Sequence, residues 1–391
     1  MKSVLYIGVG IPWQGGAGYL VRQDMFLRAL AECVHLHLAL FDFDSDATKP
    51  PFACTITPLD RPTSFKQSRV KVALDDLFSP LPRMHRGYSR ESVREQVQAL
   101  EPDRFDAVFS YRIDFARFAG VERHPRLILD IDDPEHLRQA DGLRVRLGRN
   151  IDWRTRLDLH KLRRFERDVV RSTKAAFVCQ DRDADAFEPL RPLVVCNSVD
   201  VPDQVYRCES STPTLLFVGN MIGGEQSPNG DAALWFLRSI WPTVLQHVPE
   251  CQCRLAGRMS ESLHSFIQDV PNVEAIGFVE AIAEAYANAW ISVAPIRYGT
   301  GTRIKILEAL AHACPVVSTP KGCEGIDAID GSNILVGASE AAFAQACVNL
   351  LKDSNKRHRI GQAGRELIVE RYNRYRQHDM LVDLLNRLLY E

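Results

Sequence analysis

The sequence lacks several features that would assign it to a class at once. None of its apolar runs approaches the ~18 residues needed to span a membrane. The first apolar stretch, within residues 1–16, is short, broken by glycine and strand-like, so we expect no signal peptide. The formal net charge is only −2, whereas general nucleic-acid binding needs a basic surface. These absences favour a cytoplasmic protein with no nucleic-acid partner.

Metal-binding and disulfide patterns are absent as well. None of the ten cysteines forms a C-x-x-C pair, and the eleven histidines show no H-x3-H or HExxH arrangement. Several cysteines lie in apolar strand-like runs, where a thiol behaves as a small hydrophobic side chain; these are Cys179, Cys196, Cys251 and Cys253. We therefore predict no metal site and a reducing compartment.

The composition is that of a soluble globular protein, with 46% hydrophobic and 25% charged residues. A chain of 391 residues exceeds one ordinary core, so two domains are expected. Short apolar runs alternate with helical patterns, which indicates parallel α/β units. The predicted strands are Val4–Gly10, Val34–Phe41, Ala107–Tyr111, Arg126–Ile131, Ala175–Cys179 and Leu193–Cys196 in the first half, then Leu215–Gly219, Cys253–Gly257, Val273–Ile276, Ile291–Pro295, Pro315–Ser318 and Ile334–Val336. Each half is predicted to be a Rossmann-like, doubly wound parallel sheet.

The domain boundary is expected in the polar stretch 201–214, which carries two prolines. We predict a first domain over residues 1–203, a second over 204–370 and a terminal segment, 371–391, that is helical.

The most informative segment is 294–326, where a buried strand runs into a glycine-rich turn and then a helix from about Thr302. Gly299 and Gly301 let the backbone approach a ligand, because they carry no Cβ. The first N–H groups of a helix lack intrahelical partners, and the helix dipole favours an anion there. Arg303 and Lys305 add cations, and Glu308 shares a helix face with Lys305. The pattern suits a nucleotide's phosphates and ribose, so we expect donor contacts from residues 299–303, which include Thr300 and Thr302, and from Lys305 and Glu308. The alternative is a helix N-terminus capped by Thr with an ordinary Lys–Glu pair.

This segment resembles the donor-binding signature of the family 4 retaining glycosyltransferases, which have the two-domain GT-B fold. The resemblance is to the branch with P-x3-G-x-G-x3-K-x2-E-A, followed by P-V-V and an E-G-I/L loop. The matching residues are Pro295, Gly299, Gly301, Lys305, Glu308, Ala309, Pro315, Val316, Val317, Glu324, Gly325 and Ile326. A weaker resemblance covers most of the chain.

The resemblance implies two domains facing across a cleft, with a terminal helix that crosses back to the first domain. It implies that Glu308 binds the ribose, and that the sugar is transferred with retention of configuration and without a metal. The family's common motif is Glu-x7-Glu, and the first of these positions is Thr300 here. How the sugar ring is held is therefore open.

Other candidate donor contacts follow predicted strands of the second domain. Gly219, Asn220 and Arg258 come directly after strands; Arg258 suits a diphosphate, although a solvent-exposed arginine is an alternative. Gly277, Phe278 and Val279 are similar to the family's G-x-V segment, whose backbone contacts the base. Glu324 and Gly325 are expected near the ribose or sugar. The resemblance also favours Gly15 and Gly16, in the loop after the first strand, as donor-side backbone contacts.

A cluster of carboxylates ends the strand near residue 131. Ligands bind at strand C-termini in open α/β sheets, and clustered carboxylates raise one another's pKa, which can create a general base. We predict an acceptor-side role for Asp132 and Asp133; capping of the next helix is the alternative.

Two further segments have ambiguous surface patterns. Residues 54–104 include a charged, partly apolar stretch near residue 70, and 144–167 is strongly basic. Each is explained by a solvated helix face, or by contact with an acceptor or an anionic membrane.

We therefore interpret the chain as a glycosyltransferase that moves a sugar from a UDP- or GDP-sugar to a glycan or lipid-linked acceptor. The family-level setting is bacterial polysaccharide or glycolipid synthesis, with peripheral contact to the inner membrane surface. The alternatives are an epimerase or phosphorylase on the same fold, or an inactive nucleotide-sugar-binding scaffold.

Overall fold

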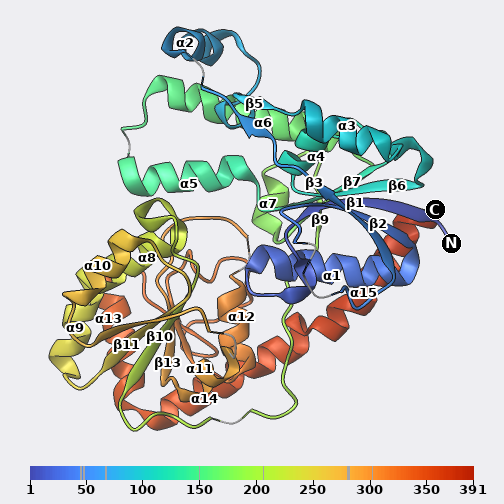
Figure 1. Cartoon of the computed structure of the whole chain (residues 1–391). Coiled ribbons are helices and arrows are strands. Elements are labelled where there is room, and N and C mark those ends of the chain that lie inside the picture. The colour runs from blue at the N-terminus through green and yellow to red at the C-terminus, as the bar shows by residue number, and fades with distance from the viewer. Residues whose placement is uncertain are drawn as a thin grey trace. The chain divides into compact units, whose positions relative to one another are not determined.

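The computed structural model describes residues 1–44, 46, 49–66, 68–148, 150–205, 207–279, 282–301 and 303–391, apart from the Arg69 side chain. The chain divides into two compact units (Figure 1). The first unit is Met1–Cys196 together with Gln377–Glu391, and the second is Asn197–Arg376. The sequence-based boundaries lay at residues 203 and 370.

The first unit is built on a seven-stranded parallel sheet with the order β3-β2-β1-β6-β7-β8-β9. Its strands are β1 (Ser3–Val9), β2 (His35–Phe41), β3 (Cys54–Leu59), β6 (Ala107–Tyr111), β7 (Leu127–Asp132), β8 (Ala175–Val178) and β9 (Leu193–Val194). Strand β1 is buried from Val4 to Val9, as expected of a strand covered on both faces.

Helices cover both faces of this sheet (Figure 1). Helices α1 (Gly18–Cys33) and α15 (Arg374–Tyr390) lie on one face, and α3 (Glu91–Ala99), α4 (Ile113–Ala119) and α6 (Trp153–Ser172) lie on the other. The remaining elements are α2 (Arg69–Phe78), α5 (Glu135–Leu147), α7 (Asp181–Asp185) and a short ribbon of β4 (Thr63–Ser64) and β5 (Tyr88–Ser89). Helix α15 adds Leu381, Leu385 and Leu389 to the core. These leucines are four apart and so share one helix face.

The second unit has a six-stranded parallel sheet with the order β12-β11-β10-β13-β14-β15. Its strands are β10 (Thr214–Val218), β11 (Gln252–Ala256), β12 (Val273–Gly277), β13 (Ile291–Ala294), β14 (Val316–Ser318) and β15 (Leu335–Val336). Its helices are α8 (Pro228–Trp235), α9 (Trp241–His247), α10 (Glu261–Gln268), α11 (Ile282–Asn288), α12 (Ile304–Ala311), α13 (Glu340–Lys352) and α14 (Ser354–Leu367). Phe236 and Trp241 are buried in the core, and Trp235 packs against it.

The strand order places a topological switch point between β10 and β13. From β10 the chain moves outward through β11 and β12, then returns to the other side of β10 as β13. Loops that follow the two strands therefore leave in opposite directions, which opens a crevice at their carboxyl ends where ligands bind in such sheets. The glycine-rich turn follows β13, and Gly219 follows β10.

The predicted α/β fold of two Rossmann-like parallel sheets is confirmed. Every predicted strand is present, with ends within about two residues of those expected. Strand β3 was not predicted, because Pro58 within CTITPL argues against a central strand. It pairs with β2 alone, at the sheet edge, where a proline is tolerated.

Among the helices of the described ranges, none is both long enough and apolar enough to cross a membrane.

Candidate active site

The glycine-rich turn has the backbone geometry that only glycine adopts readily. Gly299 has φ 116° and Gly301 has φ 75°. A Cβ on Gly299 would lie 2.9 Å from a guanidinium nitrogen of Arg303 and 3.5 Å from Pro228. The turn therefore brings bare backbone and Arg303 together at the start of α12.

Helix α12 begins later than the sequence indicated. Its first residue is Ile304, with Arg303 in the N-cap position at φ −80° and ψ 91°. Thr302, an expected donor contact, lies outside the described residues. Thr300 is buried, and its carbonyl oxygen accepts a hydrogen bond from the Arg303 guanidinium.

Lys305 extends from the first turn of α12 to the end of β10. Its Nζ donates a hydrogen bond of 2.6 Å to Oδ1 of Asn229, the second residue of α8. The same nitrogen lies 4.9 Å from the centre of the Phe217 ring. A Cβ on Gly219 would approach Nζ to 2.8 Å. The Lys305 ammonium thus connects α12 with α8 and with the end of β10. Gly219 leaves room for it because it has no Cβ.

Lys305 and Glu308 are both shifted toward their neutral forms. Burial, and secondly the charge of Arg303, lower the pKa of Lys305 to about 7. Burial raises the pKa of Glu308 to about 7, against the opposing effect of Lys305. Desolvation disfavours the charged form of either group. Two buried groups with shifted pKa values at one site, together with the contacts of Lys305 described above, indicate a binding site for a charged ligand.

Tyr286 forms a hydrogen bond to the backbone of the first turn of α12. Its hydroxyl donates a hydrogen bond of 3.2 Å to the carbonyl oxygen of Lys305. Burial and the charge of Glu308 raise the pKa of Tyr286 well above its ordinary value, so it is a neutral donor. An ion pair between Arg374 and Asp200, 3.1 Å apart, also acts on Glu308.

Three glycines align at the carboxyl ends of β10, β11 and β12. The Gly219 N–H donates to Ala256 at 2.9 Å, and the Gly257 N–H donates to Gly277 at 2.6 Å. Gly257 has φ 126°, and a Cβ there would meet the carbonyl oxygen of Gly219 at 2.1 Å. Only a residue without a Cβ fits this close approach between the ends of β10 and β11.

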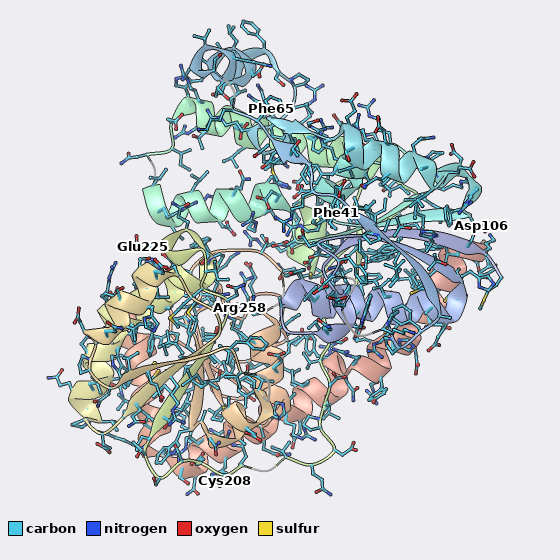
Figure 2. The ribbon with its side chains drawn as sticks, in the orientation of Figure 1. Phe41, Phe65, Asp106, Cys208, Glu225 and Arg258 are labelled. Atoms are coloured by element: carbon cyan, nitrogen blue, oxygen red, sulfur yellow. The ribbon has the colours of Figure 1, made fainter. Side chains whose placement is uncertain are left out.

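Polar and aromatic groups follow these glycines. The Arg258 guanidinium lies 5.7 Å from the ring centre of Phe278, which is largely exposed, and partly buried Val279 comes next (Figure 2). The Asn220 carbonyl oxygen accepts a hydrogen bond of 3.0 Å from the side-chain amide of Asn229. The Arg258 guanidinium thus lies over an aromatic ring, a contact that leaves its N–H groups able to donate hydrogen bonds.

Glu324 and Gly325 lie in the loop after β14. Glu324 pairs with Lys321, with 2.6 Å between Oε2 and Nζ, and Gly325 has φ 78°. Thr319 holds the loop to the end of β13, because its hydroxyl donates to the Ile296 carbonyl oxygen.

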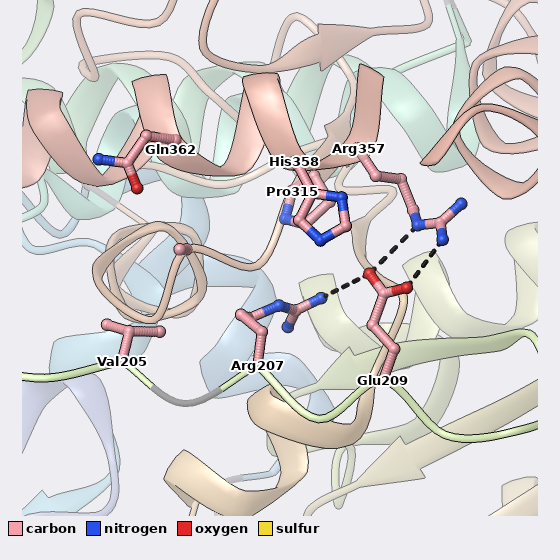
Figure 3. A pocket seen from close by; sticks show the side chains of 8 residues that line it. Val205, Arg207, Glu209, Pro315, Arg357, His358 and Gln362 are labelled. Carbon is pink, nitrogen blue, oxygen red and sulfur yellow. Dashed lines mark hydrogen bonds and ion pairs between the residues drawn. The ribbon is translucent and has the colours of Figure 1, made fainter. Parts of the chain in front are cut away.

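A separate cavity of about 200 Å³ lies in the second unit, beside Pro315, which precedes β14 (Figure 3). It is therefore at the amino ends of the strands, away from the glycine turn. Glu209 pairs there with Arg207 at 3.3 Å and with Arg357 at 2.7 Å. These charges satisfy one another, which indicates a structural contact between α14 and the segment before β10.

In the first unit, Gly15 and Gly16 adopt positive φ values of 69° and 95°. They separate a single 3-10 turn, Pro12–Gln14, from α1. The side chain of Gln23 in α1 clamps the end of β1, since it accepts from the Val9 N–H at 3.0 Å and donates to its carbonyl oxygen at 3.1 Å.

Asp132, the last residue of β7, and Asp133 contact residues at the end of β6. Asp132, with φ 62°, accepts a hydrogen bond of 2.8 Å from the Tyr111 hydroxyl, and Asp133 lies 3.6 Å from Arg112. Glu166 caps α5, because its carboxylate accepts from the N–H groups of Glu135 at 2.9 Å and of the following residue at 3.3 Å.

The carboxyl with a raised pKa in this cluster is Asp130, which the sequence analysis did not single out. Burial raises the pKa of Asp130 to about 6, although Arg22 opposes the shift from 2.6 Å away. One carboxyl of the cluster thus has a raised pKa, chiefly through burial, and the charge of Asp132 adds to the shift. Asp130 is enclosed with Arg22 and serves as an internal ion pair that also fixes the end of β9 through the Val195 carbonyl oxygen.

Sequence reasoning gave no role to Asn229 and Tyr286, the residues that position Lys305. A proline and an asparagine at the start of a helix were visible as Pro228–Asn229. The pairing of Asn229 with a lysine 76 residues away was not. It depends on the β10–β13 neighbourhood, which only the strand order reveals.

Comparison with known proteins agrees with this geometry. Residues 212–353 match a family model described as Glycosyl transferases group 1. This segment contains the glycine turn, Lys305, Glu308 and Asn229.

Similar proteins cover either part or all of the chain. An uncharacterized 44.6 kDa protein in the cps region of Klebsiella pneumoniae is 25% identical over 168 residues, which are 41% of this chain and 42% of that protein. The match thus spans less than half of that relative. A sucrose-phosphate synthase from Thermosynechococcus elongatus is 16% identical with a TM-score of 0.69, covering 100% of both chains.

Two other solved structures are also similar over nearly the full length. Anabaena HepE in complex with UDP and glucose has 16% identity and a TM-score of 0.65, covering 98% of this chain and 99% of that one. S. aureus TarM, in complex with fondaparinux, alpha-GlcNAc-glycerol and UDP, has 12% identity and a TM-score of 0.70, covering 100% of both.

The architecture is therefore the GT-B fold. Together with the matched segment, it classes the chain as an enzyme, a glycosyltransferase.

Proposed function

We propose that this glycosyltransferase moves a sugar from a nucleotide-diphosphate sugar to an acceptor hydroxyl with retention of configuration. The observation that carries the proposal is the position of the Lys305 ammonium, held by Asn229 over Gly219 at the switch point of the sheet. A cation, bare backbone and a helix N-terminus meet there, and a diphosphate needs all three.

In this proposal Arg303, Lys305 and the N–H groups after Gly301 hold the diphosphate. As the sugar–phosphate bond breaks, negative charge builds on the leaving group, and prearranged cations stabilise it most at that moment. Two cations and a helix terminus supply the positive field, so we propose that no metal is required.

Glu308 anchors the ribose hydroxyls, and Gly277, Phe278 and Val279 lie against the base. Arg258, whose guanidinium lies over the Phe278 ring, contacts the diphosphate or the base edge in this proposal. The departing phosphate accepts the acceptor's proton on the same face of the sugar. From the first unit, we propose that Asp132 and Asp133 act on the acceptor side. The Gly15–Gly16 loop contacts the donor. The acceptor is a glycan or a lipid-linked molecule. The specific branch of family 4, bacterial glycan or glycolipid synthesis and a cytoplasmic location are parts of the same proposal.

The nucleotide is testable directly. HepE and TarM were solved with UDP, so UDP is the first nucleotide to test, beside GDP, ADP and NAD, each with magnesium and with chelator. A ligand that binds only the folded state raises the melting temperature. Stabilisation by one nucleoside diphosphate in chelator supports the proposal, and stabilisation by NAD alone contradicts it.

The decisive variant is Lys305→Ala, with Lys352→Ala as its control, because Lys352 is an exposed lysine in the same unit. A charge-assisted contact contributes about 1.5–3 kcal/mol, so we expect donor affinity to fall at least tenfold in the first variant only. Donor affinity equal to wild type in Lys305→Ala would remove the proposal.

Thr300, in place of the family's first Glu, is the one observation that favours a different outcome. An epimerase or phosphorylase on the same fold, or an inactive binding protein, would retain Lys305 and Glu308. Donor turnover that depends on an added acceptor separates the transferase from all three.

A further inference from the structure

Helix α2 presents its apolar side chains to solvent and a charged side chain to the protein. Val70, Leu74 and Phe78 are 71%, 52% and 79% exposed, whereas Asp76 is only 6% exposed. The three apolar residues are four apart and so share one face of the helix. A helix on a water-soluble surface normally has the reverse arrangement, with its apolar face on the core.

Ionic contacts hold α2 in this orientation. The Asp76 carboxylate accepts hydrogen bonds from Arg83 at 2.8 and 2.6 Å and from Arg86 at 3.1 Å. The hydrogen bonds from Arg83 are the main cause that lowers the pKa of Asp76 to about 2, so it stays charged at neutral pH. From α6, Lys161 donates to the Asp76 carbonyl oxygen at 2.7 Å. Asp76, a buried residue of α2, is thus held by polar contacts of both its side chain and its backbone.

More apolar side chains continue the exposed face. Phe65, 50% exposed, precedes α2 (Figure 2), and Trp153, 57% exposed, is the first residue of α6. Arg83 joins the two elements, because its backbone N–H donates to Asp158 of α6 at 2.8 Å. We define the α2 face as Phe65, Val70, Leu74, Leu77, Phe78 and Trp153, all of which are largely exposed.

Exposed cations border the α2 face. They are Lys66, Lys71, Arg154 and Arg156. Of the two acidic residues of α2, Asp75 is half-buried, and Asp76 is turned inward and paired with Arg83 and Arg86. The surface therefore offers apolar side chains with a positive margin.

We propose that the α2 face binds the surface of an anionic lipid bilayer. A helix with an exposed apolar face and basic flanks lies in the plane of the membrane interface and buries its apolar side chains below the head groups. Anionic head groups attract the flanking Lys and Arg side chains. Helix α2 stands at the periphery of the first unit (Figure 1). Exposed apolar side chains can enter fluid lipid without needing a complementary surface, which favours lipid over a protein partner.

Binding of this kind needs neither donor nor acceptor, so it can be tested apart from the proposed function. The full chain would be sedimented with phosphatidylcholine vesicles, with or without phosphatidylglycerol. The apolar variant is Leu74→Ser with Phe78→Ser, and the charge variant is Arg154→Gln with Arg156→Gln. Ile329→Ser, at a residue that is 63% exposed in the second unit, is the matched control.

We expect wild type and the control to bind vesicles that contain phosphatidylglycerol and to bind neutral vesicles much more weakly. Loss of a buried side chain of this size reduces affinity about tenfold, so the apolar variant should remain in the supernatant. Each arginine near an anionic surface contributes about fivefold, and high salt should remove that part.

The proposal is wrong if wild type stays in the supernatant with anionic vesicles, or if the apolar variant binds as wild type does. It is also wrong if wild type forms a dimer in solution that the apolar variant abolishes, since the face would then belong to a second copy. Unchanged melting temperatures establish that the variants are folded.

Discussion

At the scale of single residues, the site contains two groups whose pKa values are shifted toward the neutral form. Lys305 and Glu308 lie three residues apart on α12, and both have a pKa near 7 in the free protein. A bound diphosphate would place negative charge beside Lys305 and so stabilise its ammonium form. Ligand binding and proton binding at this lysine should therefore be coupled.

Proton exchange on donor binding is the first prediction. At pH 8 Lys305 is mostly neutral, and an added diphosphate favours its ammonium form, so binding should take up a fraction of one proton. Below pH 7 Glu308 is mostly protonated, and binding ribose through its carboxylate should release a proton. Calorimetry in buffers of different ionisation enthalpy measures both effects. Equal proton uptake in Lys305→Met would contradict the assignment to this residue.

Stability of the ligand-free protein gives the second prediction. The pKa of Lys305 is lowered from 10.5 to about 7, so the unfolded state binds more protons between these pH values. Its contribution to stability therefore rises with pH across that window, and the buried ammonium destabilises the fold at pH 7. Lys305→Met should raise the melting temperature at pH 7 by about 2–4 °C. The difference should shrink toward pH 10; a lower melting temperature at pH 7 would contradict the account.

At the scale of elements, the sequence predicted what depends on local periodicity. The strand runs and the glycine turn after β13 both follow from neighbouring residues. The orientation of α2 did not, because Asp76 is turned inward by Arg83 and Arg86, which lie in a different segment. The pairings of Lys305 with Asn229 and of Arg22 with Asp130 depend on which strands become neighbours.

Two glycines at adjacent strand ends should respond differently to the same substitution. In Gly219→Ala the new methyl group meets two side chains, Lys305 at 2.8 Å from Nζ and Asn229 at 2.9 Å from Cγ, and no backbone atom among its nearest neighbours, so the contacts can be relieved by side-chain movement. We expect the melting temperature to change little and donor affinity to fall about tenfold, as the ammonium is displaced.

In Gly257→Ala the new methyl group meets the backbone oxygen of Gly219 at 2.1 Å, at a residue with φ 126°. The backbone cannot yield easily, so we expect a loss of about 2–4 kcal/mol in the free energy of unfolding. Chemical denaturation of the two variants side by side measures the contrast. Equal stabilities would show that the strand ends can separate.

At the scale of the whole molecule, α15 completes the core of the first unit from the far end of the chain. Leu385 is fully buried there, and the Tyr390 hydroxyl donates to the Cys33 carbonyl oxygen at 2.9 Å. The helix is therefore part of the first unit's packing.

Leu385→Ala should lower the free energy of unfolding by about 2–4 kcal/mol, because it leaves a cavity in a packed core. Met380→Ala, at a residue of the same helix that is 64% exposed, should change it by less than about 0.5 kcal/mol. Urea denaturation of both variants tests this. Similar effects would mean that α15 contributes no more than a surface helix.

The division of the chain into Met1–Cys196 with Gln377–Glu391, and Asn197–Arg376, also sets an order of assembly. The second unit is one continuous segment, and it can fold as soon as it has left the ribosome. The first unit is made first, yet it lacks three core leucines until α15 has been translated. During synthesis the second unit is therefore complete before the first. Until α15 has been made, the first unit exposes the hydrophobic surface that this helix covers.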